Sequence, residues 1–128
     1  MKDENYICHI IIPTKNSAKS KKFYQEVFRW TIEKQPVTNS FDMLPHSQKG
    51  PSAELNPEEQ VVVPAIYTTH IETKLKLIEK SGGRTLRQRT PIGKNAEQGH
   101  YALFEDPCGN KICLYSDEQL QSGSRLTR

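Results

Sequence analysis

The sequence predicts an α+β protein built from two tandem copies of one unit, each with the order strand, helix, strand, strand, strand. The first observation is a repeated apolar, β-branched segment: His9–Pro13 opens one copy, and Val63–Tyr67 opens the other 54 positions later. The second is that a helix-like run and short strand candidates follow each segment. The third is that only Pro57–Gln60 separates the copies, and each copy is too small to bury its own apolar face. A single domain over residues 6–116 is therefore expected, with modules at about 6–57 and 61–116.

The first module opens with a strand over residues 6–13, which is rich in β-branched residues and closed by a proline. Because side chains alternate along a strand, Ile7, His9 and Ile11 share one face. A helix over residues 17–28 follows, with Asn16 or Ser17 as its N-terminal cap. Its apolar stripe consists of Phe23, Tyr24, Val27 and Phe28. Short strands over 30–34, 41–44 and 52–56, with a turn-rich stretch at 45–51, complete the module.

The second module repeats this order from a strand over residues 61–67. Thr69 and Glu72 have the spacing of a capping box at the start of a helix. The helix presents Ile71, Leu75 and Ile78 on one face, and Gly82–Gly83 ends it. Strands over 84–89, 101–105 and 111–115 follow, with a tight turn at Asp106–Asn110 before the last one. The polar loop at 91–99 is a candidate lid, and residues 117–128 are expected to form a flexible tail.

The composition argues against several functional classes. Eighteen basic and 15 acidic residues give a net charge of +3, which is too mild for a nucleic-acid-binding protein. No apolar run approaches the roughly 20 residues that cross a membrane, so no membrane partner is expected. The N-terminus lacks the charge-then-apolar order of a signal peptide, and three cysteines do not make a disulfide framework. A cytoplasmic location is therefore expected.

Two groups of polar residues have a simple surface interpretation. Arg84, Arg87 and Arg89 recur along one strand candidate, and an exposed strand edge is favoured over a phosphate site. The remaining histidines, His46, His70 and His100, fall in turns or at the ends of elements and are predicted to lie at the surface; contact with the mouth of a binding cup is an alternative for His100, because it precedes a strand. The sequence contains no nucleophile elbow, phosphate-binding loop or dinucleotide fingerprint.

Three segments of the chain resemble the vicinal oxygen chelate superfamily, which includes glyoxalase I, extradiol dioxygenases and bleomycin-resistance proteins. They are His9–Pro13 with Phe23–Trp30, then Leu77–Gly83, then Phe104–Asn110; Arg29 stands where glycine is usual. The resemblance spans residues 6–116. It implies that the strands form a curled, cup-shaped mixed sheet with the helices on its convex face. A ferredoxin-like sandwich also alternates strands and helices, but it leaves the extra strands unexplained.

The resemblance also implies where a metal would be bound, by one residue from each of four strands on the cup floor. The first-strand position is His9, its counterpart in the second module is Val63, and the last-strand position is Cys113; Glu54 is the candidate on the remaining strand. Val63 cannot coordinate a metal, and a cysteine thiolate replaces a carboxylate poorly for Fe(II), Mn(II) or Mg(II). No metal or other cofactor is therefore expected. The alternative is one divalent ion (Zn, Ni, Mn or Fe) held by His9, Glu54 and Cys113.

The residues expected to line a ligand in the cup are His9, Glu54, Val63, Tyr67, Lys111, Cys113 and Tyr115. His9 is the catalytic candidate, because histidine exchanges protons near neutral pH. The alternative for His9 is a buried or half-buried histidine that is hydrogen-bonded to a neighbour on the cup floor. The alternatives for Cys113 and Glu54 are a small core residue and a solvated strand residue. Trp30 and Tyr115 are interpreted as core or dimer-packing residues.

Three functions remain open at this point. The favoured one is a metal-free, homodimeric protein of the bleomycin-resistance type that binds a small molecule in its cup. The second is a metal-dependent lyase, isomerase or dioxygenase of the glyoxalase type. The third is a non-catalytic interaction module. The residues alone do not decide whether the chain is an enzyme.

Overall fold

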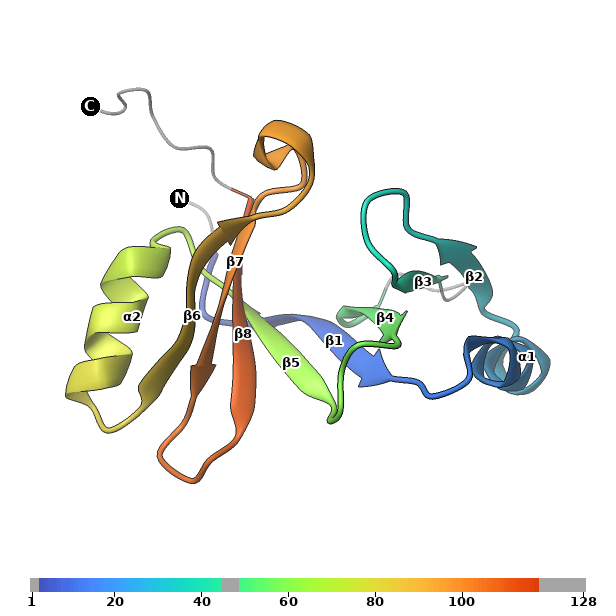
Figure 1. Ribbon diagram of the computed structural model, residues 1–128, viewed down its shortest axis with the longest axis horizontal. Coiled ribbons are helices and arrows are strands. Elements are labelled where there is room, and N and C mark those ends of the chain that lie inside the picture. The colour runs from blue at the N-terminus through green and yellow to red at the C-terminus, as the bar shows by residue number, and fades with distance from the viewer. Residues whose placement is uncertain (1–2, 45–48, 118–128) are drawn as a thin grey trace. The chain divides into compact units, whose positions relative to one another are not determined.

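The computed structural model describes residues 3–44 and 49–117, and its elements follow the predicted order (Figure 1). The elements are β1 (Ile7–Pro13), α1 (Ser17–Phe28), β2 (Thr31–Lys34), β3 (Phe41–Leu44), β4 (Ser52–Asn56), β5 (Val63–Tyr67), α2 (Ile71–Lys80), β6 (Arg84–Pro91), the 3₁₀ turn η1 (Lys94–Ala96), β7 (His100–Glu105) and β8 (Lys111–Ser116). The α+β class and the two βαβββ modules are thus confirmed. The chain divides into two compact units, residues 6–66 (the first unit) and residues 1–5 with 67–128 (the second unit).

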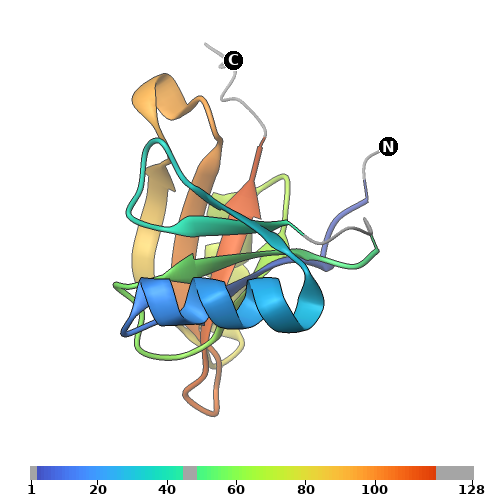
Figure 2. The same ribbon diagram turned by 90° about the vertical axis from the view of Figure 1, so that its right-hand side faces the viewer.

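The first unit contains a mixed sheet in the order β2-β3-β4-β1-β5. The strands β1 and β4 run parallel, while the other neighbours are antiparallel. Figure 2 shows α1 running alongside these strands. Between helix and sheet lies a core of Ile32, Met43 and Leu55, which is closed by Tyr24 and Trp30 among others. The remaining face of the sheet, opposite α1, is called the open face below.

A side-chain cap defines the start of helix α1, and a residue in the left-handed conformation defines its end. Asn16 is the N-terminal cap, because its side-chain Oδ1 accepts a hydrogen bond from the backbone N–H of Lys19 at 3.0 Å. Arg29, at the position where the family favours glycine, adopts the left-handed conformation with φ of 61°. A non-glycine residue there is strained, so the helix ends at some conformational cost.

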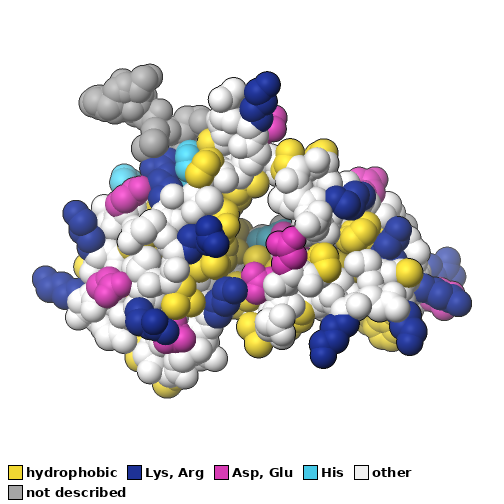
Figure 3. Space-filling model, in the orientation of Figure 1, with side chains coloured by type: hydrophobic (Ala, Val, Ile, Leu, Met, Phe, Trp, Pro, Cys, Tyr) yellow, Lys and Arg dark blue, Asp and Glu magenta, His cyan; other side chains and the backbone are white. Residues whose placement is uncertain are grey.

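The apolar stripe of α1 is only partly used by the core. Tyr24 stacks on Trp30 with ring centroids 5.5 Å apart and packs against the core. Phe23, Val27 and Phe28 instead remain about half exposed. In Figure 3, hydrophobic side chains lie among Lys and Arg side chains over the part of the surface that α1 occupies.

The second unit contains the antiparallel strands β8-β7-β6, with α2 packed on one side. The helix buries Ile71 and Leu75, as its spacing predicts. The predicted glycine stop is confirmed: Gly82 has φ of 101°, and the N–H of Gly83 donates to the carbonyl of Ile78 at 2.8 Å.

The predicted capping box at the start of α2 is wrong. The N-terminal cap is His70, which makes no side-chain capping bond, and Thr69 lies one position outside. The Glu4 carboxylate accepts hydrogen bonds from the Thr69 N–H at 2.9 Å and the Thr68 hydroxyl at 3.0 Å. These bonds hold the pKa of Glu4 below its usual range. A carboxylate 65 positions away thus lies at the start of the helix, where negative charge is favourable.

The other predicted helices and strands differ from the observed ones only at their boundaries. The strands predicted at 84–89 and 101–105 extend to Pro91 and start at His100, and the loop between them contains η1. The predictions for residues 45–48 and for the tail beyond residue 117 lie outside the described residues. Within the described part of the chain, neither helix has the length and apolar character of a membrane span.

Candidate functional site

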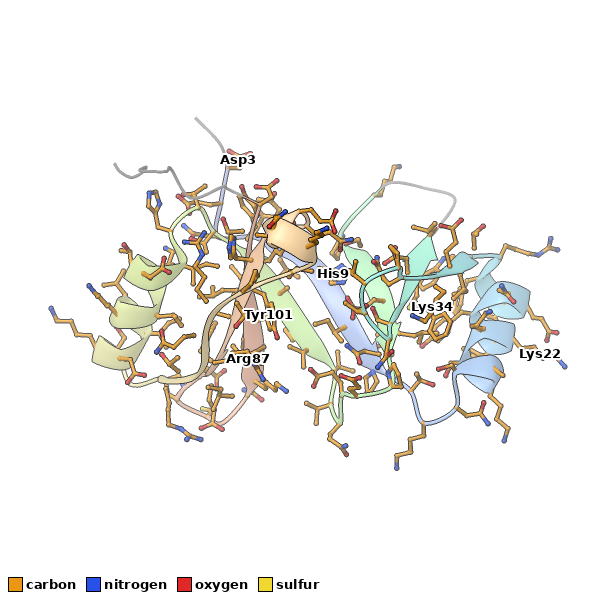
Figure 4. The ribbon with its side chains drawn as sticks, turned by 45° about the horizontal axis from the view of Figure 1, so that its top comes forward. Asp3, His9, Lys22, Lys34, Arg87 and Tyr101 are labelled. Carbon is orange, nitrogen blue, oxygen red and sulfur yellow. The ribbon has the colours of Figure 1, made fainter. Side chains whose placement is uncertain are left out.

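The open face of the first unit carries a cluster of polar side chains around His9. The alternation along β1 turns His9 away from the core, and the parallel register places Ser52 of β4 beside it. His9 Nδ1 lies 2.5 Å from Ser52 Oγ, and His9 Nε2 lies 2.7 Å from Glu54 Oε1. Glu54 Oε2 accepts a further bond from Asn56 Nδ2 at 3.2 Å. Figure 4 shows His9 on the side of the strands opposite α1.

The bonding of the His9 cluster (His9, Ser52, Glu54 and Asn56) fixes the roles of both ring nitrogens. A carboxylate only accepts hydrogen bonds, so Nε2 of His9 is protonated and donates to Glu54. With neutral imidazole, Nδ1 is then the acceptor, and the Ser52 hydroxyl donates to it. The result is a continuous chain of hydrogen bonds along β4, in which one basic nitrogen faces one hydroxyl group.

Partial exposure distinguishes this cluster from a core network. The side chains of His9 and Glu54 are 25% and 18% exposed, and Ser52 is an exposed residue. A small molecule at the open face can therefore reach the cluster, while its geometry is held by two paired strands rather than by a loop. The geometry is also that of the alternative for His9, a half-buried histidine bonded to its neighbours.

Further carboxylates line the open face next to the cluster. Glu54 pairs with Asp42 across β4 and β3, and Asp42 pairs with Glu33 across β3 and β2. Asp42 accepts a hydrogen bond from Gln35 Nε2 at 2.6 Å. Side chains directly opposite one another share a face, so three acidic residues stand in a row that favours ligands able to donate hydrogen bonds.

The resemblance implied that His9 and Glu54 lie on the same cup floor as candidate metal ligands with Cys113, and the structure places His9 against Glu54. Neither Ser52 nor Asn56 was singled out from the sequence. The sequence does contain part of the information needed to identify them. Ser52, Glu54 and Asn56 alternate along one strand, so their side chains must share one face of it. The parallel register between β1 and β4, which places Ser52 against His9, is set by the fold and cannot be seen in either strand alone.

Val63 lies where the repeat predicts, at the start of β5 and paired with Ile11 of β1. It is completely buried and contributes only apolar contact. In the first unit the donors at the predicted metal positions are thus one imidazole and one carboxylate. These two are hydrogen-bonded to each other. In the part of the chain that the structure describes, no three His, Cys, Asp or Glu side chains gather to hold a metal ion. Two donors of one unit do not by themselves fit the metal of the family, which the resemblance implies is held by one residue from each of four strands.

The other predicted ligand-lining residues belong to the second unit. Cys113 is buried, and its thiol lies 3.4 Å from the carbonyl oxygen of Leu114. The Tyr67 hydroxyl donates to Asp117 at 2.6 Å, and the Tyr115 hydroxyl donates to the carbonyl of Gln98 at 2.8 Å. The two tyrosine rings lie 6.4 Å apart. Lys111 pairs with Glu105 across β8 and β7. The role of Tyr67, Lys111, Cys113 and Tyr115 in ligand binding stays a prediction.

His100 is not a surface residue, contrary to the prediction from its position. It is 8% exposed, and its Nδ1 lies 3.1 Å from Nη2 of Arg89. Arg89 also donates to Glu72 of α2 at 3.4 Å. Burial, followed by the nearby Arg89 charge, lowers the pKa of His100, while Glu72 acts in the opposite direction. His70, in contrast, is exposed as predicted.

The predicted exposed arginine edge is correct for Arg84 and Arg87 but wrong for Arg89, whose side chain is 16% exposed. Strict alternation would give Arg87 and Arg89 the same face. However, β6 has an irregular register between Arg87 and Thr90, where one extra residue is accommodated against β7. Such a bulge reverses the alternation and turns Arg89 toward His100 and α2. Figure 4 labels Arg87 and Tyr101 on the strand face that does not carry α2.

Comparisons with known proteins agree with this fold. Residues 6–114 match the sequence family described as the Glyoxalase/Bleomycin resistance protein/Dioxygenase superfamily. No curated protein matches the chain significantly. Among solved structures, the chain is similar to a hypothetical protein from Bacillus halodurans C-125, with 14% identity, a TM-score of 0.66 and coverage of 90% of this chain and 96% of that one.

Two further structures extend this likeness. A methylmalonyl-CoA epimerase shares 14% identity at a TM-score of 0.63, with 93% of this chain and 100% of that one covered. A superfamily member from Vibrio splendidus 12B01 shares 12% identity at a TM-score of 0.62, with 89% and 99% covered. At such identities the structural likeness establishes the fold alone, whereas the sequence match covers most of the chain. The chain therefore belongs to the glyoxalase/bleomycin resistance protein/dioxygenase superfamily.

Proposed function

We propose that this protein binds a small organic molecule at the open face of its first unit, where His9 contacts the ligand. The observation that carries this proposal is the His9 cluster. It is a partly exposed imidazole held at both ring nitrogens by Ser52 and Glu54, on the sheet face opposite α1. An imidazole that is already oriented loses little conformational freedom when a ligand binds, which supports recognition.

The open face also indicates the polarity of the ligand. Glu54, Asp42 and Glu33 present carboxylates in register, and a carboxylate accepts hydrogen bonds without donating any. A neutral or cationic ligand with hydroxyl or amino groups suits this surface, whereas an anionic ligand is repelled. That the fold can hold an organic molecule is supported by a methylmalonyl-CoA epimerase that was solved in complex with methylmalonyl-CoA.

The test is a ligand screen in which the resonances of the histidine side chains report binding. Protein labelled with ¹⁵N in histidine is titrated with a library of neutral and cationic small molecules, and binders are expected to shift the His9 resonances. His9→Ala should abolish binding of these compounds with the fold retained, as judged by the backbone amide spectrum. The matched control is His70→Ala, which removes an exposed histidine of the second unit and should leave binding unchanged. Binders that shift His70 but leave His9 untouched would contradict the proposal.

The wider expectations belong to the same proposal: a cytoplasmic homodimer that needs no cofactor. The glyoxalase-type alternative, with His9, Glu54 and Cys113 around one divalent ion, makes a separate prediction. Protein loaded with Ni²⁺, Zn²⁺ or Mn²⁺ would form or hydrolyse S-lactoylglutathione. Absence of turnover with all three ions would remove that alternative. An interaction module without chemistry would show neither small-molecule binding nor turnover.

A further inference from the structure

We propose that Ser52 is an activated nucleophile that takes the acyl group of small esters, with His9 as its general base and Glu54 as the group that positions His9. The inference deepens the proposed function, since it needs the same open face to admit a small molecule. It is carried by an arrangement of three side chains from two paired strands, Ser52 and Glu54 on β4 and His9 on β1.

The first part of the argument is the direction of the Ser52 hydroxyl. Ser52 Oγ lies 2.5 Å from His9 Nδ1 but 3.3 Å from the carbonyl oxygen of Cys8. O–H···acceptor bonds are favoured at about 2.7 Å and weaken as they lengthen, so the histidine is the better acceptor. The hydroxyl therefore points at the basic nitrogen that can remove its proton, which is the contact that activates a serine.

The second part is the support on the far side of the imidazole ring. Glu54 Oε1 accepts the Nε2–H of His9 at 2.7 Å, and Asn56 holds the other carboxylate oxygen at 3.2 Å. The carboxylate selects the tautomer with a free electron pair on Nδ1 and stabilises the imidazolium that forms when Nδ1 takes a proton. Nucleophile, base and positioning carboxylate are recognised by such geometry and roles rather than by order in the sequence.

The third part is access. A serine that is buried with its partners makes a structural hydrogen bond, but Ser52 is exposed and the His9 and Glu54 side chains keep part of their surface in solvent. The row of Glu54 and Asp42 carboxylates disfavours a negatively charged substrate at this point. The substrate class is therefore a neutral or cationic ester of a small carboxylic acid.

The reaction balances with water as the only co-reactant. Ser52 Oγ forms a bond to the ester carbonyl carbon while His9 Nδ1 takes the hydroxyl proton. The carbon–oxygen bond to the leaving alcohol then breaks, and that alcohol receives the proton from His9. Water next attacks the acyl-serine, His9 takes a proton from it and returns the proton to Ser52 Oγ, and the carboxylic acid is released.

The experiment is covalent labelling of the whole protein with a neutral alkyl fluorophosphonate, followed by intact mass measurement and peptide mapping. Attack by Ser52 forms a phosphorus–oxygen bond and releases fluoride, and the adduct is stable. One adduct at Ser52 is expected, together with a burst of p-nitrophenol from p-nitrophenyl acetate. His9→Ala should slow labelling by about 10²-fold or more, the scale of a lost general base, and Glu54→Gln by about tenfold. The controls are Ser81→Ala, an exposed serine of the second unit, and His70→Ala, and neither should change the rate.

Two results would overturn the inference. One is a correctly folded wild-type protein that forms no adduct, or forms it elsewhere than Ser52. The other is a labelling rate that Glu54→Gln and His9→Ala leave unchanged; the Glu54→Gln variant, which keeps the side-chain shape, remains decisive where His9→Ala disturbs the fold. Ser52→Ala separates the two proposals, because it removes the nucleophile and leaves His9 in place. Ligand-induced shifts of His9 in that variant preserve the proposed binding function even where labelling fails.

Discussion

His9 and His100 have the same imidazole side chain in two different environments. His9 lies on the open face, where its Nδ1 is bonded to the Ser52 hydroxyl and its Nε2 to the Glu54 carboxylate. His100 is buried on the α2 side of β7, and its resolved side-chain partner is the cation Arg89. Protonation of His100 would place two positive charges about 3 Å apart in a poorly solvated site, which accounts for its lowered pKa.

This environment predicts a loss of stability in mild acid. The folded-state pKa of His100 lies below the unfolded value of about 6.5, so the unfolded state binds more protons as the pH falls below that value. The free energy of unfolding should therefore decrease between about pH 6.5 and the folded pKa. His100→Gln, which keeps an acceptor for Arg89 and cannot be protonated, should flatten that decrease in urea titrations at a series of pH values.

The control for this prediction is His70→Gln, because His70 is exposed and close to α2 as well. It should leave the pH dependence as in the wild-type protein. Hydrogen bonds from Thr69, Thr85 and Asn110 lower the carboxyl pKa values of Glu4, Glu79 and Asp106, respectively, so these groups affect stability at lower pH than His100 does. Equal slopes for wild type and His100→Gln between pH 7 and 5 would contradict the assignment.

At the scale of elements, sequence predictions succeeded where the deciding contacts are local. The helix α1 has its predicted bounds, because a cap three residues from its partner and an apolar stripe of close spacing are both visible in the sequence. The start of α2 was mispredicted, since a carboxylate 65 positions away takes the Thr69 N–H. The inward turn of Arg89 was missed because a bulge depends on the partner strand.

The half-exposed stripe of α1 leads to a prediction about packing in the first unit. Met43 is fully buried in the core, and Met43→Ala should lower the free energy of unfolding by about 3 kcal/mol, as for other large-to-small core changes. Phe23 keeps about half of its surface in solvent and contacts Tyr24 and Phe28 edge-on. Phe23→Ala should therefore cost only about 1 kcal/mol. Urea denaturation followed by fluorescence of Trp30 measures both, and equal losses would show that the stripe is packed.

At the scale of the whole molecule, the repeat predicted the two βαβββ modules, but the grouping of their strands is a property of the fold. The strand β5, which opens the second copy in sequence, is hydrogen-bonded to β1 of the first copy. Residues up to Ile66, which include most of β5, accordingly belong to the first compact unit. The repeat marks where homologous segments begin, whereas hydrogen bonding between strands decides which segments pack together.

The side chains at the predicted metal positions predict how the thermal stability of the protein responds to removal of metal ions. His9 and Glu54 are bonded to each other, and Val63 offers no donor. A chelator should therefore shift the thermal midpoint by less than about 1 °C, since a ligand that is not bound does not stabilise the native state. Differential scanning calorimetry of protein purified without chelator, before and after addition of EDTA, measures this. A fall of several degrees that Zn²⁺ restores would instead support the His9, Glu54 and Cys113 site.

The contact of Glu4 with the start of α2 has a consequence for the order in which the chain folds. Glu4 and Asn5 have partners, Thr68, Thr69 and Tyr67, that lie more than sixty positions later in the sequence. Bringing such distant segments together costs loop-closure entropy, so contacts of this kind slow folding. Glu4 and Asn5 can make these contacts only once residues 67–69 lie beside them. Because the whole first unit, residues 6–66, separates the two segments in the sequence, we expect the second unit to form these contacts late in folding.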